Sequence, residues 1–202
     1  MIYRQSYLYP PRPEMVIDKS RLNSFSDDYV AQIKMNGTCS IIMVKPSTKE
    51  LICMNRHKEI HKAWSPDIKK MSWFLNLPGN GWYVFVSELL HNKVKGIKDV
   101  NYIHDILVCD DDYLVSKTQS DRMSILTGLC LKNDRRFYYE IDQFTWITKE
   151  FNNNFEELFN SLNQEVYEGL VIKNVNTKLK LCLKENSNTS DMFKCRKPNK
   201  LH

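Results

Sequence analysis

Several strand-like segments of the sequence each carry a charged residue. Residues 82–90 (WYVFVSELL) and 167–174 (YEGLVIKN) are rich in the β-branched, aromatic and other apolar residues that favour strands, yet both contain glutamate or lysine. Burying an unpaired charge is expensive, so strand interiors usually exclude it. A single charged residue can face solvent, whereas charges on several successive strands predict a sheet face that lines a polar pocket.

The segment AQIKMNGTCSIIMV, residues 31–44, places Lys34 two residues before an Asn-Gly pair. Asn-Gly between apolar runs is a strong signal for a hairpin turn. We therefore expect a β-hairpin over residues 31–44, followed by a third strand over residues 50–55. The hairpin alone does not explain why a lysine stands at the mouth of the turn.

The rest of the chain mixes helical and strand patterns, which predicts an α+β fold. The prolines of YPPRPE favour an extended N-terminal segment. Further strands are expected over residues 100–110, 137–144, 178–184 and 192–198. Helices are expected near residues 66–75, after Ser120 as an N-cap, and over residues 151–166. No internal repeat or low-complexity linker interrupts the pattern, so we expect a single domain over residues 1–202.

Composition excludes several classes of protein. The 202 residues contain no apolar run of about 18, so no membrane span is expected. The N-terminus is polar and rich in proline, unlike a secretory signal. The six cysteines form no C-x-x-C pair, which argues against a zinc site or a disulfide framework and favours a cytoplasmic protein, including a viral or phage protein acting in the host cytoplasm. A net charge of +5 only weakly indicates a polyanionic partner.

Five motifs occur in a fixed order along most of the chain. They are KMNG at Lys34, SELL around Glu88, YIHDILV around Asp105, EGLVIK from Glu168 and FKCRK at Lys194. KMNG alone is a weak signal and EGLVIK is more specific, but the ordered set resembles the covalent nucleotidyltransferases, which comprise polynucleotide ligases and mRNA-capping guanylyltransferases. The forms KMNGT and FKCRK are most similar to those of RNA ligases, particularly the adenylyltransferase domain of the nick-sealing branch.

This resemblance implies both a fold and a chemistry. The fold would be the ATP-grasp-like catalytic domain of ligases, with mainly antiparallel sheets flanked by helices and here without an OB-fold domain. A lysine amine would attack the α-phosphorus of ATP and expel pyrophosphate, leaving a lysyl-adenylate. The AMP would then pass to a nucleic-acid 5′-phosphate, from which an adjacent 3′-hydroxyl displaces it. Lys34 is the implied nucleophile.

An amine must be neutral to attack phosphorus, whereas a free lysine has a pKa of about 10.4. Neighbouring cations, a bound metal or desolvation would have to favour the neutral form. A Mg²⁺ or Mn²⁺ ion would offset charge on the triphosphate, and the resemblance assigns Glu168 to placing that metal.

The resemblance also assigns nucleotide-binding positions. Glu88 matches a carboxylate that binds the ribose hydroxyl, and His104 stands where an aromatic ring stacks on the base, with Tyr102 as an alternative of the same strand parity. Gln32 matches a residue that reads the base edge, but an amide can donate or accept, so it does not decide between adenine and guanine. The full set is Gln32, Ile33, Asn36, Gly37, Arg56, Glu88, His104, Lys173, Lys194 and Arg196.

Strand periodicity predicts which of these residues share a face. Lys34 should lie on the same face as Gln32, two residues before it. Similarly, Lys194 should share a face with Arg196 and Glu168 with Ile172. Each position also has an ordinary alternative, such as a surface lysine beside a turn, a solvent-facing glutamate or a solvated basic C-terminus.

Two residues depart from the family pattern. Asn36 stands where DNA ligases and capping enzymes usually carry aspartate, which favours RNA as the substrate. Ser87 stands where glycine normally precedes the glutamate, and we expect its side chain to crowd the nucleotide.

Three functions remain open from the sequence. The first is an ATP-dependent ligase core acting on a 5′-phosphate end of RNA or of a nicked duplex, with an accessory subunit or domain in place of the OB fold and no membrane partner. The second is a GTP-dependent capping guanylyltransferase. The third is a catalytically weak module that binds nucleic-acid ends, which both departures and the missing second domain would favour.

Overall fold

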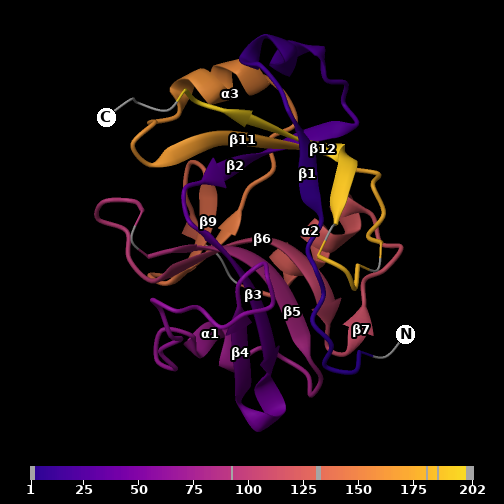
Figure 1. Cartoon of the computed structure of the whole chain (residues 1–202), viewed down its shortest axis with the longest axis vertical. Helices are drawn as coiled ribbons and strands as arrows, with labels where there is room; N and C mark the ends of the chain where they lie inside the picture. Colours follow the sequence, from indigo (N-terminus) through magenta and orange to yellow (C-terminus); the bar gives the residue numbers. More distant parts are fainter. Residues whose placement is uncertain (1–2, 92, 131–132, 181, 186, 199–202) are drawn as a thin grey trace.

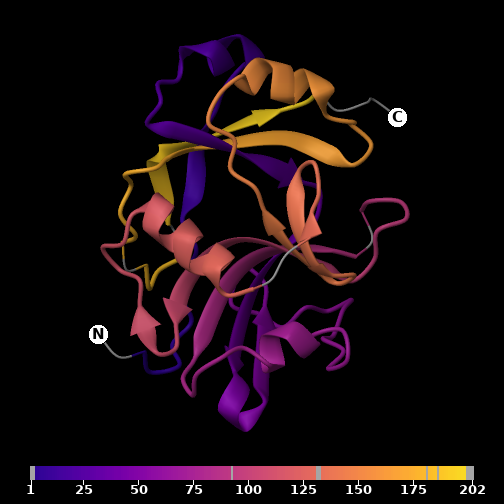
Figure 2. The same cartoon turned by 180° about the vertical axis from the view of Figure 1, so that it is seen from behind.

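Two β-sheets, one above the other in Figures 1 and 2, form the body of the protein. The computed structural model describes residues 3–91, 93–130, 133–180, 182–185 and 187–198. The smaller sheet has the strand order β1 (Arg12–Val16), β12 (Asn188–Arg196), β11 (Tyr167–Asn174) and β2 (Tyr29–Met35).

The larger sheet is built around β3, β5 and β6. Its order is β4 (Glu50–Met54), β3 (Thr38–Lys45), β5 (Tyr83–Leu90), β6 (Val100–Cys109), β10 (Thr145–Thr148), β9 (Tyr138–Asp142) and β8 (Asn133–Asp134), with β7 (Asp112–Tyr113) paired to β6. In the described part of the chain, β1–β12 and β6–β10 are parallel and the other strand pairs antiparallel, which confirms the predicted α+β fold with mainly antiparallel sheets.

Short helices cover the sheets. These are α1 (Ser72–Leu75), α2 (Gln119–Gly128) and α3 (Phe155–Ser161), with 3₁₀ turns η1 (Lys19–Ser24) and η2 (Pro46–Thr48). In Figure 2, α3 lies over the outer side of the smaller sheet and α2 lies beside the larger one. None of the helices in the described ranges has the length and hydropathy that crossing a membrane requires.

The smaller sheet has one apolar and one polar face. On β2, Ala31, Ile33 and Met35 are buried in the same core as Phe155 and Phe159 of α3. Because side chains alternate along a strand, the residues between them point away from α3, toward the larger sheet. This alternation places Gln32 and Lys34 on one face of β2, as predicted.

The predicted hairpin over residues 31–44 is wrong. β2 pairs with β11, whereas β3 pairs with β4 and β5, so the two strands on either side of Asn36–Gly37 belong to different sheets. A Cβ added at Gly37 would lie 2.6 Å from Glu88 Cγ and 2.7 Å from the Leu89 carbonyl oxygen. The glycine therefore serves a tight crossing between sheets, where the main chain passes directly against β5.

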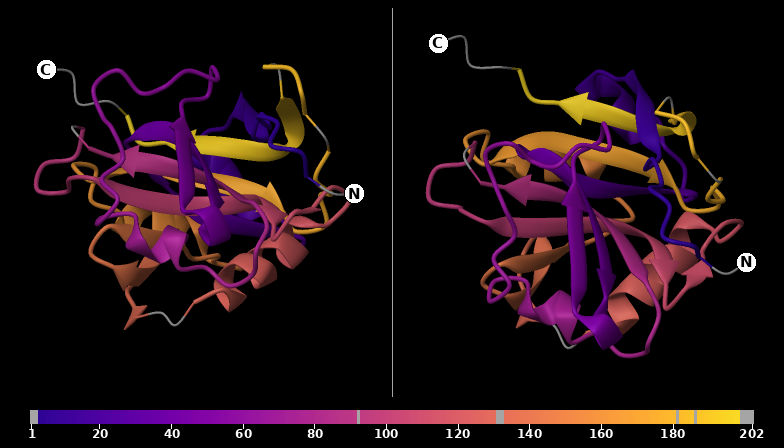
Figure 3. Two further views of the ribbon diagram at one scale, coloured as in Figure 1. Left: turned by 90° about the horizontal axis from the view of Figure 1, so that it is seen from below. Right: turned by 60° about the horizontal axis from the view of Figure 1, so that its bottom comes forward.

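Two local predictions also need correction. Residues 178–184 form no strand in their described part, where Lys178 makes only an isolated bridge with Thr118. The N-cap of α2 is Thr118 rather than Ser120, since Thr118 and Asp121 form a reciprocal capping box. The predicted extended N-terminal segment is confirmed, since its second half begins β1, which lies beside β12 (Figure 3).

A β-bulge at the start of β11 changes the predicted face of Glu168. The register with β2 shifts between Tyr167 and Gly169, and Gly169 has φ +144°. The extra residue reverses the alternation, so Glu168 faces the same side as Lys173 while Ile172 is buried in the core. The expectation that Glu168 and Ile172 share a face is therefore wrong.

We expect Gly169→Ala to lower the free energy of unfolding by about 2 kcal/mol or more. The new Cβ would lie 2.0 Å from the Cys195 carbonyl oxygen, at a backbone conformation that L residues rarely adopt. Gly128→Ala is the matched control, because nothing lies within 4 Å of its added Cβ. Chemical denaturation of both variants checks the difference, and equal stabilities would contradict it.

Candidate active site

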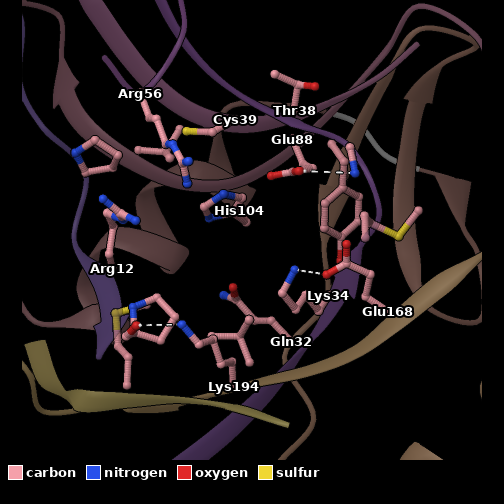
Figure 4. A pocket seen from close by; sticks show the side chains of 18 of the residues that line it. Arg12, Gln32, Lys34, Thr38, Cys39, Arg56, Glu88, His104, Glu168 and Lys194 are labelled. Carbon is pink, nitrogen blue, oxygen red and sulfur yellow. Dashed lines mark hydrogen bonds and ion pairs between the residues drawn. The ribbon is translucent and has the colours of Figure 1, made fainter. Parts of the chain in front are cut away.

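A cavity of about 530 Å³ lies between the two sheets (Figure 4). The polar face of the smaller sheet supplies Arg12, Gln32, Lys34, Glu168, Val171, Lys173, Met192, Lys194 and Arg196. The larger sheet and its loops supply Thr38, Cys39, Arg56, His57, Val86, Glu88, Lys93, Tyr102 and His104. Residues far apart in the sequence are thus brought around one space.

The structure brings together the predicted site residues with one exception. The predicted residues that border the cavity are Gln32, Ile33, Lys34, Gly37, Arg56, Glu88, His104, Glu168, Lys173, Lys194 and Arg196. Asn36 does not border it. The side chain of Ile33 packs in the core opposite Leu170, which leaves its main chain for the cavity.

Lys34 and Glu168 form an ion pair inside the cavity. Lys34 lies opposite Gly169 in the β2–β11 ladder, and its Nζ donates a hydrogen bond to Glu168 Oε2 (Figure 4). The Arg196 Nε lies 3.9 Å from the same oxygen. The bulge at the start of β11 turns Glu168 toward the cavity, so the ion pair between Lys34 and Glu168 depends on this bulge.

Glu88, on β5 of the larger sheet, contacts the segment in which the main chain crosses from one sheet to the other. Its Oε1 accepts a hydrogen bond of 3.1 Å from the Gly37 N–H. Burial, reinforced by the charge of Glu168, raises the pKa of Glu88 to about 7, while Lys34 and Lys93 act in the opposite direction. A carboxyl with this pKa changes charge near neutrality.

His104 presents a neutral ring to the cavity. Burial, reinforced by the charge of Lys173, lowers the pKa of His104 to about 3. Lys173 is only 2% exposed, and its Nζ donates to the His104 carbonyl oxygen at 3.2 Å. The alternative ring, Tyr102, is almost completely buried and its hydroxyl donates to Thr148 at 2.7 Å, so it is held within the core.

Basic side chains surround one part of the cavity. Lys194 Nζ donates to the Pro13 carbonyl oxygen at 3.5 Å, and burial lowers its pKa, assisted by the charges of Arg196 and Arg12. Arg56 Nε donates to His57 Nε2 at 3.0 Å. This part of the site is suited to a multiply charged anion.

Sequence reasoning missed two basic residues of the cavity. Arg12 lies in the proline-rich segment, and only the pairing of β1 with β12 brings it to the cavity that Lys194 also borders. Lys93 lies in the loop after β5 and donates a hydrogen bond to the Gly37 carbonyl oxygen. Neither residue belongs to a motif, so the sequence offered no signal beyond its positive charge.

Ser87 does not crowd the cavity. It is completely buried, and its hydroxyl donates to the Ser40 carbonyl oxygen at 3.0 Å, within the pairing of β5 with β3. Adjacent residues of a strand point to opposite faces, so Ser87 faces away from the space that Glu88 borders. The expected crowding of a nucleotide is therefore wrong.

The carboxylates suit a metal that is shared with a phosphate ligand. Among the described residues, no cluster of three or more His, Cys, Asp or Glu side chains could hold a metal by itself. Glu88 and Glu168 nevertheless border the same cavity, and the charge of Glu168 contributes to the raised pKa of Glu88. Mg²⁺ is commonly bound by one or two carboxylates together with substrate phosphates, so these two residues fit that mode.

Comparison with known proteins identifies the fold. No protein-family model and no curated protein matches the sequence. A solved structure of "mycobacterial DNA ligase D complexed with ATP and MES" superposes with a TM-score of 0.68 at 10% identity, covering 98% of this chain and 62% of that one. The ligase domain of M. tuberculosis LigD gives 0.65 at 10% identity, covering 95% of this chain and 60% of that one.

A Lig E DNA ligase gives a TM-score of 0.56 at 10% identity, covering 92% of this chain and 68% of that one. The protein therefore has the fold of the catalytic nucleotidyltransferase domain of ATP-dependent DNA ligases. It spans less than two thirds of the length of the first two structures.

We expect Glu88→Gln to stabilise the protein more at pH 8 than at pH 5. The pKa of Glu88 rises from 4.5 to about 7 on folding. Between about pH 4.5 and 7 the folded state therefore holds a proton that the unfolded state has lost, and stability is lost as the pH rises through this range. Glutamine removes this loss, which amounts to at most about 3 kcal/mol.

Chemical denaturation at the two pH values measures the effect. Glu157→Gln, at an exposed position of α3, is the matched control. An equal change in stability at pH 5 and pH 8 for Glu88→Gln would show that the carboxyl does not titrate in this range.

Proposed function

We propose that this chain is the nucleotidyltransferase core of an ATP-dependent polynucleotide ligase that forms a lysyl-adenylate on Lys34. One observation carries the proposal. The motif residues, which are distant in sequence, surround a single cavity in which Lys34 lies beside Glu168 and near the basic residues Lys194 and Arg196. The fold shared with ATP-dependent DNA ligases supports the same conclusion.

The proposed first step joins Lys34 to AMP. The Nζ lone pair forms a bond with the α-phosphorus of ATP, the bond from that phosphorus to the bridging oxygen breaks, and pyrophosphate leaves. In its ion pair with Glu168, Lys34 is an ammonium without a free lone pair, so it must lose a proton before it attacks, and Glu168 is within hydrogen-bonding distance to receive that proton. The ion pair between Lys34 and Glu168 therefore prepares both the orientation of the amine and the route of its proton.

The remaining residues bind the nucleotide. Lys173, Lys194 and Arg196 would contact phosphate oxygens, Arg56 the phosphate or ribose, and Glu88 the ribose hydroxyl. The neutral ring of His104 would stack on the base, since an uncharged imidazole loses little hydration there. Arg12 and Lys93 are further cations of the same cavity.

A divalent cation would be held by Glu168, with Glu88 nearby, and would offset the charge of the triphosphate. ATP is the proposed donor because the motifs resemble those of ligases, and one structure with this fold was solved as a complex with ATP.

We expect the protein to gain the mass of one AMP when incubated with ATP and Mg²⁺ in the absence of nucleic acid. Lys34→Ala should form no detectable adduct, because it lacks the attacking amine. Lys69→Ala, at an exposed position outside the cavity, should react like the parent protein. Intact-protein mass spectrometry measures the adduct, and an adduct that persists in Lys34→Ala would refute the assignment of the nucleophile.

We expect the adenylylated protein to transfer AMP to the 5′-phosphate at a nick, and to an RNA strand faster than to a DNA strand. The reason is the similarity of KMNGT and FKCRK to RNA ligase motifs, together with Asn36. Matched nicked duplexes differing only in the sugar of the 5′-phosphate strand measure the preference. Labelling by GTP alone would instead favour a capping-type enzyme, and binding of ends without any adduct would favour a non-catalytic module.

A further inference from the structure

A chain of buried hydrogen bonds lies behind the cavity and begins at Asp105. This aspartate is next to His104 on β6 but points to the opposite face, toward α2. Arg122 of α2 binds it twice, with Nε 2.8 Å from Oδ1 and Nη2 3.0 Å from Oδ2. Both side chains are at most 5% exposed, so the guanidinium is held in one orientation.

The fixed guanidinium sets the orientation of Gln119. Arg122 Nη2 also donates to Gln119 Oε1 at 2.8 Å, and a guanidinium can only donate hydrogen bonds. The amide nitrogen of Gln119 must therefore point the other way, and it donates to Glu150 Oε1 at 3.1 Å. Glu150 Oε1 therefore accepts this hydrogen bond. In the neutral form of the carboxyl the proton would lie on Oε2, so Oε1 is an acceptor in both charge states.

Gln32 is the last member of the chain. Its Nε2 donates to Glu150 Oε1 at 3.2 Å and to Met123 Sδ at 3.6 Å. Both hydrogens of the amide therefore have acceptors. In the part of the chain that the structure describes, no donor contacts its Oε1, although the residue is only 2% exposed and borders the cavity.

The position of Gln32 suits contact with a base rather than with phosphate. Gln32 borders the cavity, and Figure 4 draws it among the side chains that line it, below His104 in this view. It is uncharged, and the nearby ring of His104 is neutral. Cations, by contrast, surround the part of the cavity near Lys194 and Arg196, where a triphosphate would be bound.

We propose that Glu150, Gln119, Arg122 and Asp105 are positioning residues that orient the Gln32 amide so that the site selects adenine over guanine. The oriented amide offers a carbonyl oxygen to the base. Adenine carries an amino group at its six position, which donates to that oxygen, whereas guanine carries a carbonyl there and would leave two acceptors facing each other. This inference rests on the proposed function only in requiring that a purine nucleotide occupies the cavity.

Nucleotide binding in a Lys34→Ala background tests the proposal without any covalent chemistry. Isothermal titration calorimetry with ATP and with GTP gives the ratio of the two dissociation constants. We expect ATP to bind at least about tenfold more tightly, since an unpaired buried polar group costs about one hydrogen bond.

Glu150→Gln should reduce this ratio by about tenfold, because an amide at position 150 can donate to the Gln32 oxygen and let that side chain turn over. Glu157→Gln is the matched control and should keep the ratio of the parent. The double variant Gln32→Glu with Glu150→Gln should recover the preference for ATP, since a carboxylate at position 32 offers acceptors in either orientation and the new amide can donate to it. A merely structural role of Glu150 would not be rescued in this way.

Four results would overturn the inference. They are a parent that prefers GTP, a parent that binds neither nucleotide, a Glu150→Gln protein with the ratio of the Glu157→Gln control, and a double variant that folds but does not recover the preference. Selective binding of ATP without any adduct on the protein containing Lys34 would overturn the proposed function alone. Thermal unfolding of each variant separates a loss of preference from a loss of fold.

Discussion

The passage of the main chain against β5 at Gly37 is the constraint on which the site depends. A side chain at this position would collide with Glu88 and Leu89, so only glycine allows β2 to end in one sheet and β3 to begin in the other. The Gly37 N–H is hydrogen-bonded to Glu88 on one side of the crossing. Lys34, three residues earlier, thereby lies at the boundary of the two sheets, where a cavity can be lined from both.

Much of the secondary structure and several faces could be predicted from the sequence. The strands near residues 82–90, 100–110 and 167–174 were predictable because their dense β-branched and aromatic residues leave few other conformations favourable. The two-residue period of a strand was enough to predict that Lys34 shares a face with Gln32, and Lys194 with Arg196. The cavity lining confirms both predictions.

The remaining features depend on long-range contacts or on irregular backbone. Asn-Gly predicts a local hairpin, but β2 and β3 gain their partners from β11 and β5, which no local pattern reveals. The bulge before Gly169 reverses the alternation that periodicity assumes for Glu168. Glu150 and Arg122 lie outside every motif. Arg122 joins the site because α2 packs behind β6, and Glu150 joins it because it follows β10, which pairs with β6.

The cavity is lined by two separate β-sheets, and this has a consequence for the stability of the protein. Arg12, Lys194 and Arg196 belong to one sheet, whereas Glu88 and His104 belong to the other. A molecule that touches both sets acts as a tether across the boundary, and its binding free energy adds to the resistance of the entire chain to unfolding. Binding of a ligand in the site should therefore raise the free energy of unfolding of the whole protein, and its release should lower it.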